Sequence, residues 1–246
     1  MNSPRVLRAL PVGLLAALAG CAINLGGPKE IDYGVLAYAV PAGTSAGDAA
    51  QRIRDAGADI VLLSAARDSA WLAGVAEATG HTLTGPGAAG RTTFAFLAGE
   101  AVGDTTLALP FGNGDTLHVH DALYELANER WLDLLLVGVD STMSLRDAMR
   151  TLLTYIATDV MQESAVMVAI DAGPGVSGAE LAALLQPAFT AVSACAREGE
   201  DDGGFERAGE LPMYLFFGPE ARVRCRSARV LPGAGEPVYA RLIVRR

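Results

Sequence analysis

The sequence predicts a layered α/β or α+β domain, in which strands occur in pairs and helices lie outside them. Three features of the chain support this class. Strand-like and helix-like segments alternate over the first third, a strand-rich stretch with Gly, Pro and Asn turns fills the middle, and three more strands close the chain. No internal repeat of fixed period interrupts this order.

The first four elements alternate between strand and helix. Ser45 and Asp48 have the spacing of a helix N-cap, and Gly57 and Gly80 are typical helix stops. A run of apolar residues between the two helices is typical of a buried strand. The elements expected here are a strand at 33–40, a helix at 44–56, a strand at 59–65 and a helix at 68–79.

The remaining elements follow from turn residues and apolar periodicity. The longest helix is expected at 144–160, where Ser144 and Asp147 form a capping box and apolar residues recur at helical spacing. The strands are expected at 92–97, 105–109, 116–126, 131–139, 165–170, 213–217, 222–230 and 237–244. A second short helix is expected at 177–185, and the acidic, Gly-rich stretch 198–210 is expected to be a loop.

The net charge excludes one class of partner. The chain of 246 residues carries a formal charge of −9, whereas nucleic-acid affinity comes mostly from Lys and Arg side chains that neutralise phosphates. We therefore expect no DNA or RNA partner. The length and the apolar content of 51% suit one globular domain plus a small appendage.

The N-terminus has the pattern of an export signal. Arg5 and Arg8 precede an apolar run at 9–19, which at about 1.5 Å per residue is too short to span a membrane. Leu18-Ala19-Gly20-Cys21 looks like a bacterial lipobox, in which Cys21 receives the lipid. We expect a signal peptide at 1–20 and a lipidated cysteine with a tether at 21–32. The alternative is an ordinary signal peptide with a chance cysteine.

Lipidation would place the protein in the cell envelope. Two acyl chains hold a protein at a membrane essentially permanently. Because Ala22, not Asp, follows the cysteine, the resemblance favours the outer membrane facing the periplasm in a Gram-negative cell. Cys195 and Cys225 would then lie in a compartment that permits disulfides. They are candidates for a bridge, and the alternative is two small buried side chains.

Five segments follow one another along the chain in the same order as the motifs of one known superfamily. They are Tyr38-Ala39-Val40-Pro41, Asp59-Ile60-Val61-Leu62-Leu63-Ser64-Ala65-Ala66, Leu136-Val137-Gly138-Val139-Asp140, Ile170-Asp171-Ala172-Gly173 and Gly233-Ala234-Gly235-Glu236-Pro237-Val238. Together they resemble the endonuclease/exonuclease/phosphatase superfamily of metal-dependent phosphoesterases. The resemblance implies a layered sandwich over residues 33–246, with two β-sheets packed face to face and helices on both outer faces.

The motif residues of that family are largely missing here. The family's metal-binding Glu corresponds to Ala65, and of its seven functional positions only Asp171 keeps a polar side chain. The positions are Ala39, Ala65, Gly138, Asp171, Gly173, Ala234 and Gly235. One carboxylate and water do not hold magnesium tightly. The resemblance therefore implies a catalytically inactive domain with no cofactor, acting as a binding or scaffolding module for an envelope protein or a small anionic ligand.

Two other functions remain open from the sequence. One is an active phosphodiesterase or phosphatase that uses Mg²⁺ or Mn²⁺ at a rearranged site around Asp171, Asp140 and Glu236. The other is a purely structural lipoprotein without a ligand. Asp171 is the weak candidate for holding a metal, and Asp140 could contact a ligand; for both, a helix cap or a solvated loop carboxylate is the alternative.

The remaining motifs have simpler explanations. His118 and His120 share a strand face and could chelate zinc only with a further ligand, Asp115 or Asp121. His81 is expected at the surface, and the GxGxxG string at 85–90 lacks the strand–helix context of a dinucleotide site. Four arginines, at 222, 224, 226 and 229, are expected on a solvated strand face, with an anionic partner as the alternative.

Overall fold

The structure is a computed structural model that describes residues 30–65, 67–89, 92–112, 114–126, 130–160, 164–195, 205 and 210–245. The expected signal peptide, Cys21, most of the tether and nearly all of the expected loop at 198–210 lie outside these residues. Among the described residues, no helix has the length and apolar character needed to cross a membrane.

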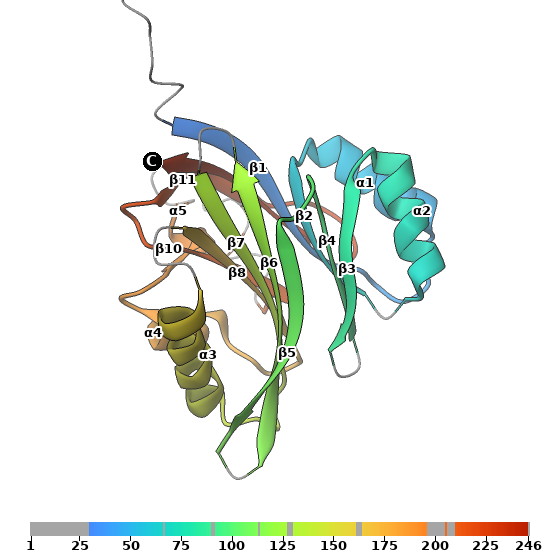
Figure 1. Cartoon of the computed structure of the whole chain (residues 1–246). Coiled ribbons are helices and arrows are strands. Elements are labelled where there is room, and N and C mark those ends of the chain that lie inside the picture. The colour runs from blue at the N-terminus through green and yellow to red at the C-terminus, as the bar shows by residue number, and fades with distance from the viewer. Residues whose placement is uncertain are drawn as a thin grey trace, which may run out of the picture.

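Two six-stranded β-sheets form the centre of the domain (Figure 1). The first sheet has the order β11-β12-β1-β2-β4-β3, and the second has the order β5-β6-β7-β8-β10-β9. The first sheet consists of β1 (Glu30–Ala39), β2 (Ile60–Ala65), β3 (Thr82–Ala89), β4 (Thr92–Ala98), β11 (Val223–Val230) and β12 (Val238–Arg245). The second consists of β5 (Gly103–Phe111), β6 (Asp115–Leu126), β7 (Arg130–Val139), β8 (Ala165–Ala172), β9 (Thr190–Ala191) and β10 (Met213–Gly218).

Each sheet contains one parallel pair of strands, and these pairs position the candidate site. β1 pairs in parallel with β2, and β7 pairs in parallel with β8. Parallel strands end at the same edge of their sheet. The last residues of β1 and β2, and those of β7 and β8, therefore lie together at the carboxyl edges of the two sheets.

The two sheets pack face to face over an apolar core. Val35 and Phe96 of the first sheet belong to the same buried cluster as Leu134, Met167 and Leu215 of the second. Alternate residues of each strand point into this layer, as the period of two in a strand requires. This arrangement is the face-to-face sandwich that the resemblance implied.

Helices cover the outer face of each sheet (Figure 1). The helices α1 (Ala46–Ala56) and α2 (Ser69–Thr79) pack on the first sheet, where Ile53 and Leu72 join a cluster with Leu36. The helices α3 (Leu145–Asp159) and α4 (Gly178–Leu185) pack on the second sheet through Leu152 and Leu181. The short helix α5 (Val192–Cys195) follows β9.

The predicted helix ends are partly confirmed. The Ser45 hydroxyl accepts the Asp48 backbone N–H at 3.1 Å, and Gly57 ends α1 in the left-handed region. The predicted capping box of α3 is wrong, because the Ser144 hydroxyl donates to the Asp147 carboxylate at 2.8 Å and caps no backbone N–H. The apolar stripe predicted for α3 is confirmed, because Met149 and Leu152 are buried.

Three features of the fold differ from the sequence expectations. The tether ends earlier than expected, because residues 30–32 pair with the end of β12 and belong to β1. The strand β3 occupies a Gly- and Pro-containing stretch for which no element was predicted, and it pairs with β4 across an irregularity between Thr84 and Gly87. The short elements β9 and α5 were also not predicted.

A disulfide joins Cys195 of α5 to Cys225 of β11, with a Cα–Cα distance of 5.8 Å. The two cysteines are 30 residues apart in the chain. Since α5 adjoins the second sheet and β11 is the edge strand of the first, the bond links the two layers of the sandwich.

Candidate functional site

The seven family positions lie along the carboxyl edges of the parallel strands. Ala39 ends β1 beside Ser64 of β2, with which it shares a register position. Ala65 follows Ser64 and ends β2. On the second sheet, Gly138 of β7 is paired with Asp171 of β8. The positions that the resemblance assigned to the family's chemistry are thus at one edge of the sandwich.

A hydrogen bond from Ser64 to Asp171 joins the two sheets at this edge. The Ser64 hydroxyl donates to the Asp171 carboxylate, although the residues are 107 positions apart in the chain. Ser64 is 3% exposed. The one retained family carboxylate is therefore engaged by a neighbouring strand of the opposite sheet. Ser64 was not singled out from the sequence, because it precedes the expected glutamate position and is not one of the seven functional positions.

The closing loop between β11 and β12 packs directly against the first strand. Gly235 has a φ of +80°, and a β-carbon at this position would collide with the Ala39 carbonyl oxygen and lie 2.9 Å from Tyr38 Cε2. Arg52 of α1 donates to the Ala234 carbonyl at 2.9 Å and lies over the Tyr38 ring. The loop has no room for a larger side chain at the position of the family's histidine.

The loop after β8 is similarly filled. The Gly173 N–H donates to the Val139 carbonyl at 2.8 Å, and a β-carbon on Gly173 would lie 3.1 Å from Asp140 Cβ. Such a separation is shorter than carbon atoms normally adopt in a packed interior. The Asp140 carboxylate accepts the Thr142 backbone N–H at 2.8 Å. Asp140 therefore organises the turn that leads into α3.

This edge does not fit a divalent metal ion. Mg²⁺ in proteins is bound by one or two carboxylates together with waters and substrate phosphates. Here the positions of the family's Glu and first Asn are Ala65 and Ala39, and the carboxylate of Asp171 accepts from Ser64. Within the described ranges, no three His, Cys, Asp or Glu side chains group in a way that could hold a metal.

Among the described residues, the acidic residues suggested for a rearranged site do not form a group that could hold a metal. Asp140 serves a turn beside β7, and Asp171 is bonded across the sheets. Glu236 has a φ of +36° within the closing loop, where its N–H donates to the Gly233 carbonyl at 3.2 Å. The described residues thus give no cluster of the three carboxylates.

Arg67 places a positive charge next to this edge. Its guanidinium donates to the Pro41 carbonyl at 3.0 Å and lies 5.8 Å from the centre of the Trp71 ring. Arg67 follows β2 closely, and Pro41 follows β1. Together with Arg52, it holds the loops that follow the first two strands of this edge.

The two histidines of β6 form no zinc site with the residues that the structure describes. His120 is buried between the sheets, where it stacks on Phe96 with 4.8 Å between ring centres and its Nδ1 lies 2.8 Å from the Thr106 hydroxyl. Burial lowers the pKa of His120. Asp121, one residue along the strand, points to the opposite face, where it accepts from the Tyr155 hydroxyl of α3 at 2.5 Å. The imidazole of His120 and the Asp121 carboxylate therefore cannot share an ion.

The structure also tests two smaller expectations, which concern His81 and the GxGxxG string. His81 is partly buried, not at the surface, with its Nε2 3.1 Å from the Ala58 carbonyl. The GxGxxG string overlaps β3 as far as residue 89 and is followed by β4, so it lacks the helix that a dinucleotide site requires. Its last glycine lies outside the described residues.

A hollow of about 550 Å³ lies between α4, β9, α5 and β10. Most of its described lining is apolar or small, and Glu210 is the only carboxylate among those lining residues. Pockets with apolar walls and few polar groups are typical of binding sites. No sequence pattern indicated this hollow, because its walls come from segments whose proximity depends on the fold.

The comparisons with known proteins agree on the fold. No family model and no curated protein matches the sequence. Solved structures do match: an endonuclease/exonuclease/phosphatase family protein from Bacteroides thetaiotaomicron has a TM-score of 0.68 at 10% identity, covering 89% of this chain and 100% of that one. An endonuclease/exonuclease/phosphatase from Bacteroides vulgatus has a TM-score of 0.67 at 12% identity, covering 87% of this chain and 100% of that one.

Two further similar structures have more specific names. A mannosyl-6-phosphatase from Bacteroides thetaiotaomicron has a TM-score of 0.66 at 11% identity, covering 85% of this chain and 99% of that one. The D. rerio TDP2 complexed with a single strand DNA product has a TM-score of 0.61 at 14% identity, with 86% and 98% covered. At these identities the comparisons establish the fold alone. The described part of this chain therefore has the fold of these endonuclease/exonuclease/phosphatase structures.

Proposed function

We propose that this chain is a membrane-anchored bacterial lipoprotein whose phosphoesterase-like domain is catalytically inactive and acts as a binding or scaffolding module in the cell envelope. The ligand is either an envelope protein or a small anionic molecule. We place the protein at the outer membrane, facing the periplasm, if the cell is Gram-negative.

The observation that carries the proposal is the packing of the edge along which the seven family positions lie, which we call the family edge. Alanine and glycine at the family positions remove the groups that bind metal and move protons, and the closing loop leaves no space at Gly235 for a histidine. Catalytic groups that act as a unit do not work singly. Asp171 alone, accepting a hydrogen bond from Ser64, therefore supplies too little of the chemistry.

One observation favours the alternative of an active metal-dependent phosphodiesterase or phosphatase. Asp171 is retained at the end of β8, and one similar structure is a mannosyl-6-phosphatase. In that case, Mg²⁺ or Mn²⁺ would require ligands that the described residues do not bring together. The inactive domain is the better supported of the two.

A hydrolysis assay distinguishes the two functions. A chain of residues 22–246 retains every contact described above, because all described elements lie between residues 30 and 245. We expect no turnover of bis-p-nitrophenyl phosphate or p-nitrophenyl phosphate above the buffer rate with Mg²⁺ or Mn²⁺. Turnover that is lost in Asp171→Ala and kept in the control Asp159→Ala, at the end of α3, would overturn the proposal.

The lipid anchor needs its own test. Expression of the full chain in bacteria with labelled palmitate is expected to label the wild type and to leave Cys21→Ala unlabelled, since the Cys21 thiol is the proposed acceptor. Mass spectrometry of the membrane fraction should find a chain that begins at Cys21. An unmodified chain that is cleaved elsewhere would contradict the anchor, without affecting the proposal about catalysis.

A further inference from the structure

The positive charge of this acidic protein is concentrated in its last two strands. Residues 222–246 contain seven of the 19 basic residues of the chain and one acidic residue, Glu236. The chain as a whole has a formal charge of −9. Such an asymmetry gives one part of the surface a potential opposite to that of the remainder.

The fold collects four of these arginines on one face, which we call the arginine face. It consists of Arg224, Arg226, Arg241 and Arg245. Arg224 and Arg245 pair with Glu30 at 3.1 and 3.5 Å, and Arg226 and Arg241 pair with Asp32 at 3.0 and 3.1 Å. Four guanidinium groups thus share two carboxylates, so the face keeps an excess of positive charge.

The guanidinium groups remain open to a ligand. The side chains of Arg224 and Arg226 are 48% and 65% exposed, and that of Arg241 is 48% exposed. Each guanidinium has five N–H donors, of which a carboxylate oxygen engages one or two. α1 and α2 lie over the β2, β4 and β3 side of the same sheet and do not cover β11 (Figure 1).

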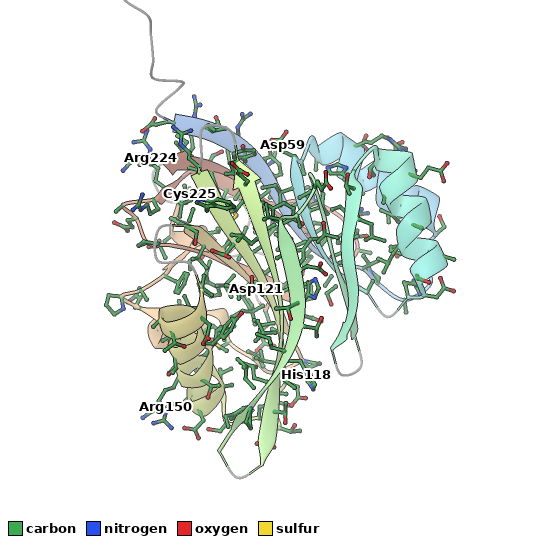
Figure 2. The ribbon with its side chains drawn as sticks, viewed as in Figure 1. Asp59, His118, Asp121, Arg150, Arg224 and Cys225 are labelled. Atoms are coloured by element: carbon green, nitrogen blue, oxygen red, sulfur yellow. A yellow bond between two sulfur atoms is a disulfide. The ribbon has the colours of Figure 1, made fainter. Side chains whose placement is uncertain are left out.

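The arginine face lies where the chain enters the domain. Glu30 is the first residue of β1 and itself belongs to the ion pairs of this face. Figure 2 shows Arg224 and Cys225 at this end of the molecule. Cys21 precedes Glu30 by nine residues, a span of at most about 30 Å even when fully extended. A lipid on Cys21 would therefore hold the arginine face close to the bilayer.

We propose that the arginine face docks on the anionic phospholipid headgroups of the membrane that carries the lipid anchor. This inference rests on the lipidation in the proposed function. Arginine binds phosphate in a bidentate manner and is weakly hydrated, so it suits contact with headgroup phosphates. A hollow of about 920 Å³, whose lining includes Arg224, Arg226 and Arg245 together with the carboxylates of Glu30 and Glu220, adjoins the face and offers space for such groups.

Docking would set the orientation of the domain. Ala39, at the other end of β1, lies about 30 Å from Glu30 along a strand of ten residues. The family edge would consequently face away from the bilayer and stay accessible to a partner. The anchor raises the local concentration of headgroups, so a modest affinity of the face suffices to orient the protein.

Vesicle sedimentation tests the docking without the lipid anchor. We would use residues 22–246 with vesicles of phosphatidylcholine, alone or mixed equally with phosphatidylglycerol. The test variant is Arg224→Gln with Arg226→Gln. The matched control is Arg146→Gln with Arg150→Gln, which removes the same charge from α3, well away from Arg224 (Figure 2).

We expect the wild type and the control to bind the mixed vesicles at low salt and not the neutral ones. At about fivefold in affinity per arginine near a charged surface, the test variant should bind about 25-fold more weakly. High salt should abolish the binding.

Three results would overturn the proposal: no binding to mixed vesicles at low salt, equal binding to neutral vesicles, or equal losses in both variants. The first result would leave an anionic protein as the partner of the face. Circular dichroism checks that both variants keep the fold. Failure of lipidation would appear in the palmitate labelling. The vesicle result could still be interpreted, because that experiment uses residues 22–246 without the lipid anchor.

Discussion

Asp133 is a buried carboxylate whose replacement should stabilise the protein at neutral pH. It lies on β7, is 3% exposed and accepts a hydrogen bond from the Ser164 hydroxyl. Its pKa is raised from 3.8 to about 6, because burial and the charge of Asp121 raise it by more than the hydrogen bond from Ser164 lowers it. We expect Asp133→Asn to keep the shape and the acceptor for Ser164 while removing the buried charge.

The magnitude follows from the pKa of Asp133. A folded-state pKa above the unfolded value means that the folded protein binds the proton more tightly. The free energy of unfolding therefore decreases as pH rises from about 4 to about 6 and is constant above. The difference corresponds to about 3 kcal/mol. Burying the N–H₂ group of Asn costs about 1 kcal/mol, so the variant should be about 2 kcal/mol more stable than the wild type at pH 7.5.

Urea unfolding at several pH values measures this difference. The variant's advantage should disappear near pH 4, where Asp133 of the wild type is protonated. Asp32→Asn is the control of opposite sign, because hydrogen bonds and charges from Arg241 and Arg226 lower the pKa of Asp32. That control should be less stable than the wild type at pH 7.5, and the deficit should shrink as pH falls. An Asp133→Asn variant that is destabilised at pH 7.5, or shifted equally at both pH values, would refute the reasoning.

Three other predictions concern the packing of the domain. Gly235→Ala should cost at least 2 kcal/mol more in urea unfolding than Gly43→Ala, because both have positive φ but only Gly235 has close neighbours; equal losses would contradict the packed loop. Replacing Cys195 and Cys225 together by Ser should cost about 3–4 kcal/mol for a loop of this length, and an unchanged midpoint would exclude a bond in the native protein. Ser64→Ala should cost about 1–3 kcal/mol at pH 7 by removing one hydrogen-bond donor from the partly buried Asp171 carboxylate, whereas no loss would show that the cross-sheet bond is weak.

The order of elements was predictable because it depends on local patterns. Alternating apolar residues, caps and turn residues mark most strands and helices, and the resemblance of the five family-like segments implied two sheets packed face to face. The strand β3 was not predictable, since Gly85 and Pro86 favour a turn locally and only pairing with β4 makes the segment extended.

The position of the candidate site was predictable from the sequence, but its packing and its hydrogen bonds were not. The identities of Ala39 and Ala65 show in the sequence which groups are missing. That Gly235 packs against the backbone of Ala39, and that Ser64 bonds to Asp171, depends on contacts between residues far apart in the chain. The spacing of Arg224 and Arg226 indicated a shared face, but their partners, Glu30 and Asp32, are each 194 residues away.

The most direct test of the account is the binding of Mn²⁺ to residues 22–246, followed by the electron paramagnetic resonance signal of the free ion. A domain whose family edge is filled by alanine, glycine and a bonded Asp171 should show no saturable binding below millimolar Mn²⁺. Stoichiometric binding at micromolar Mn²⁺ that is lost in Asp171→Ala would contradict the inactive site.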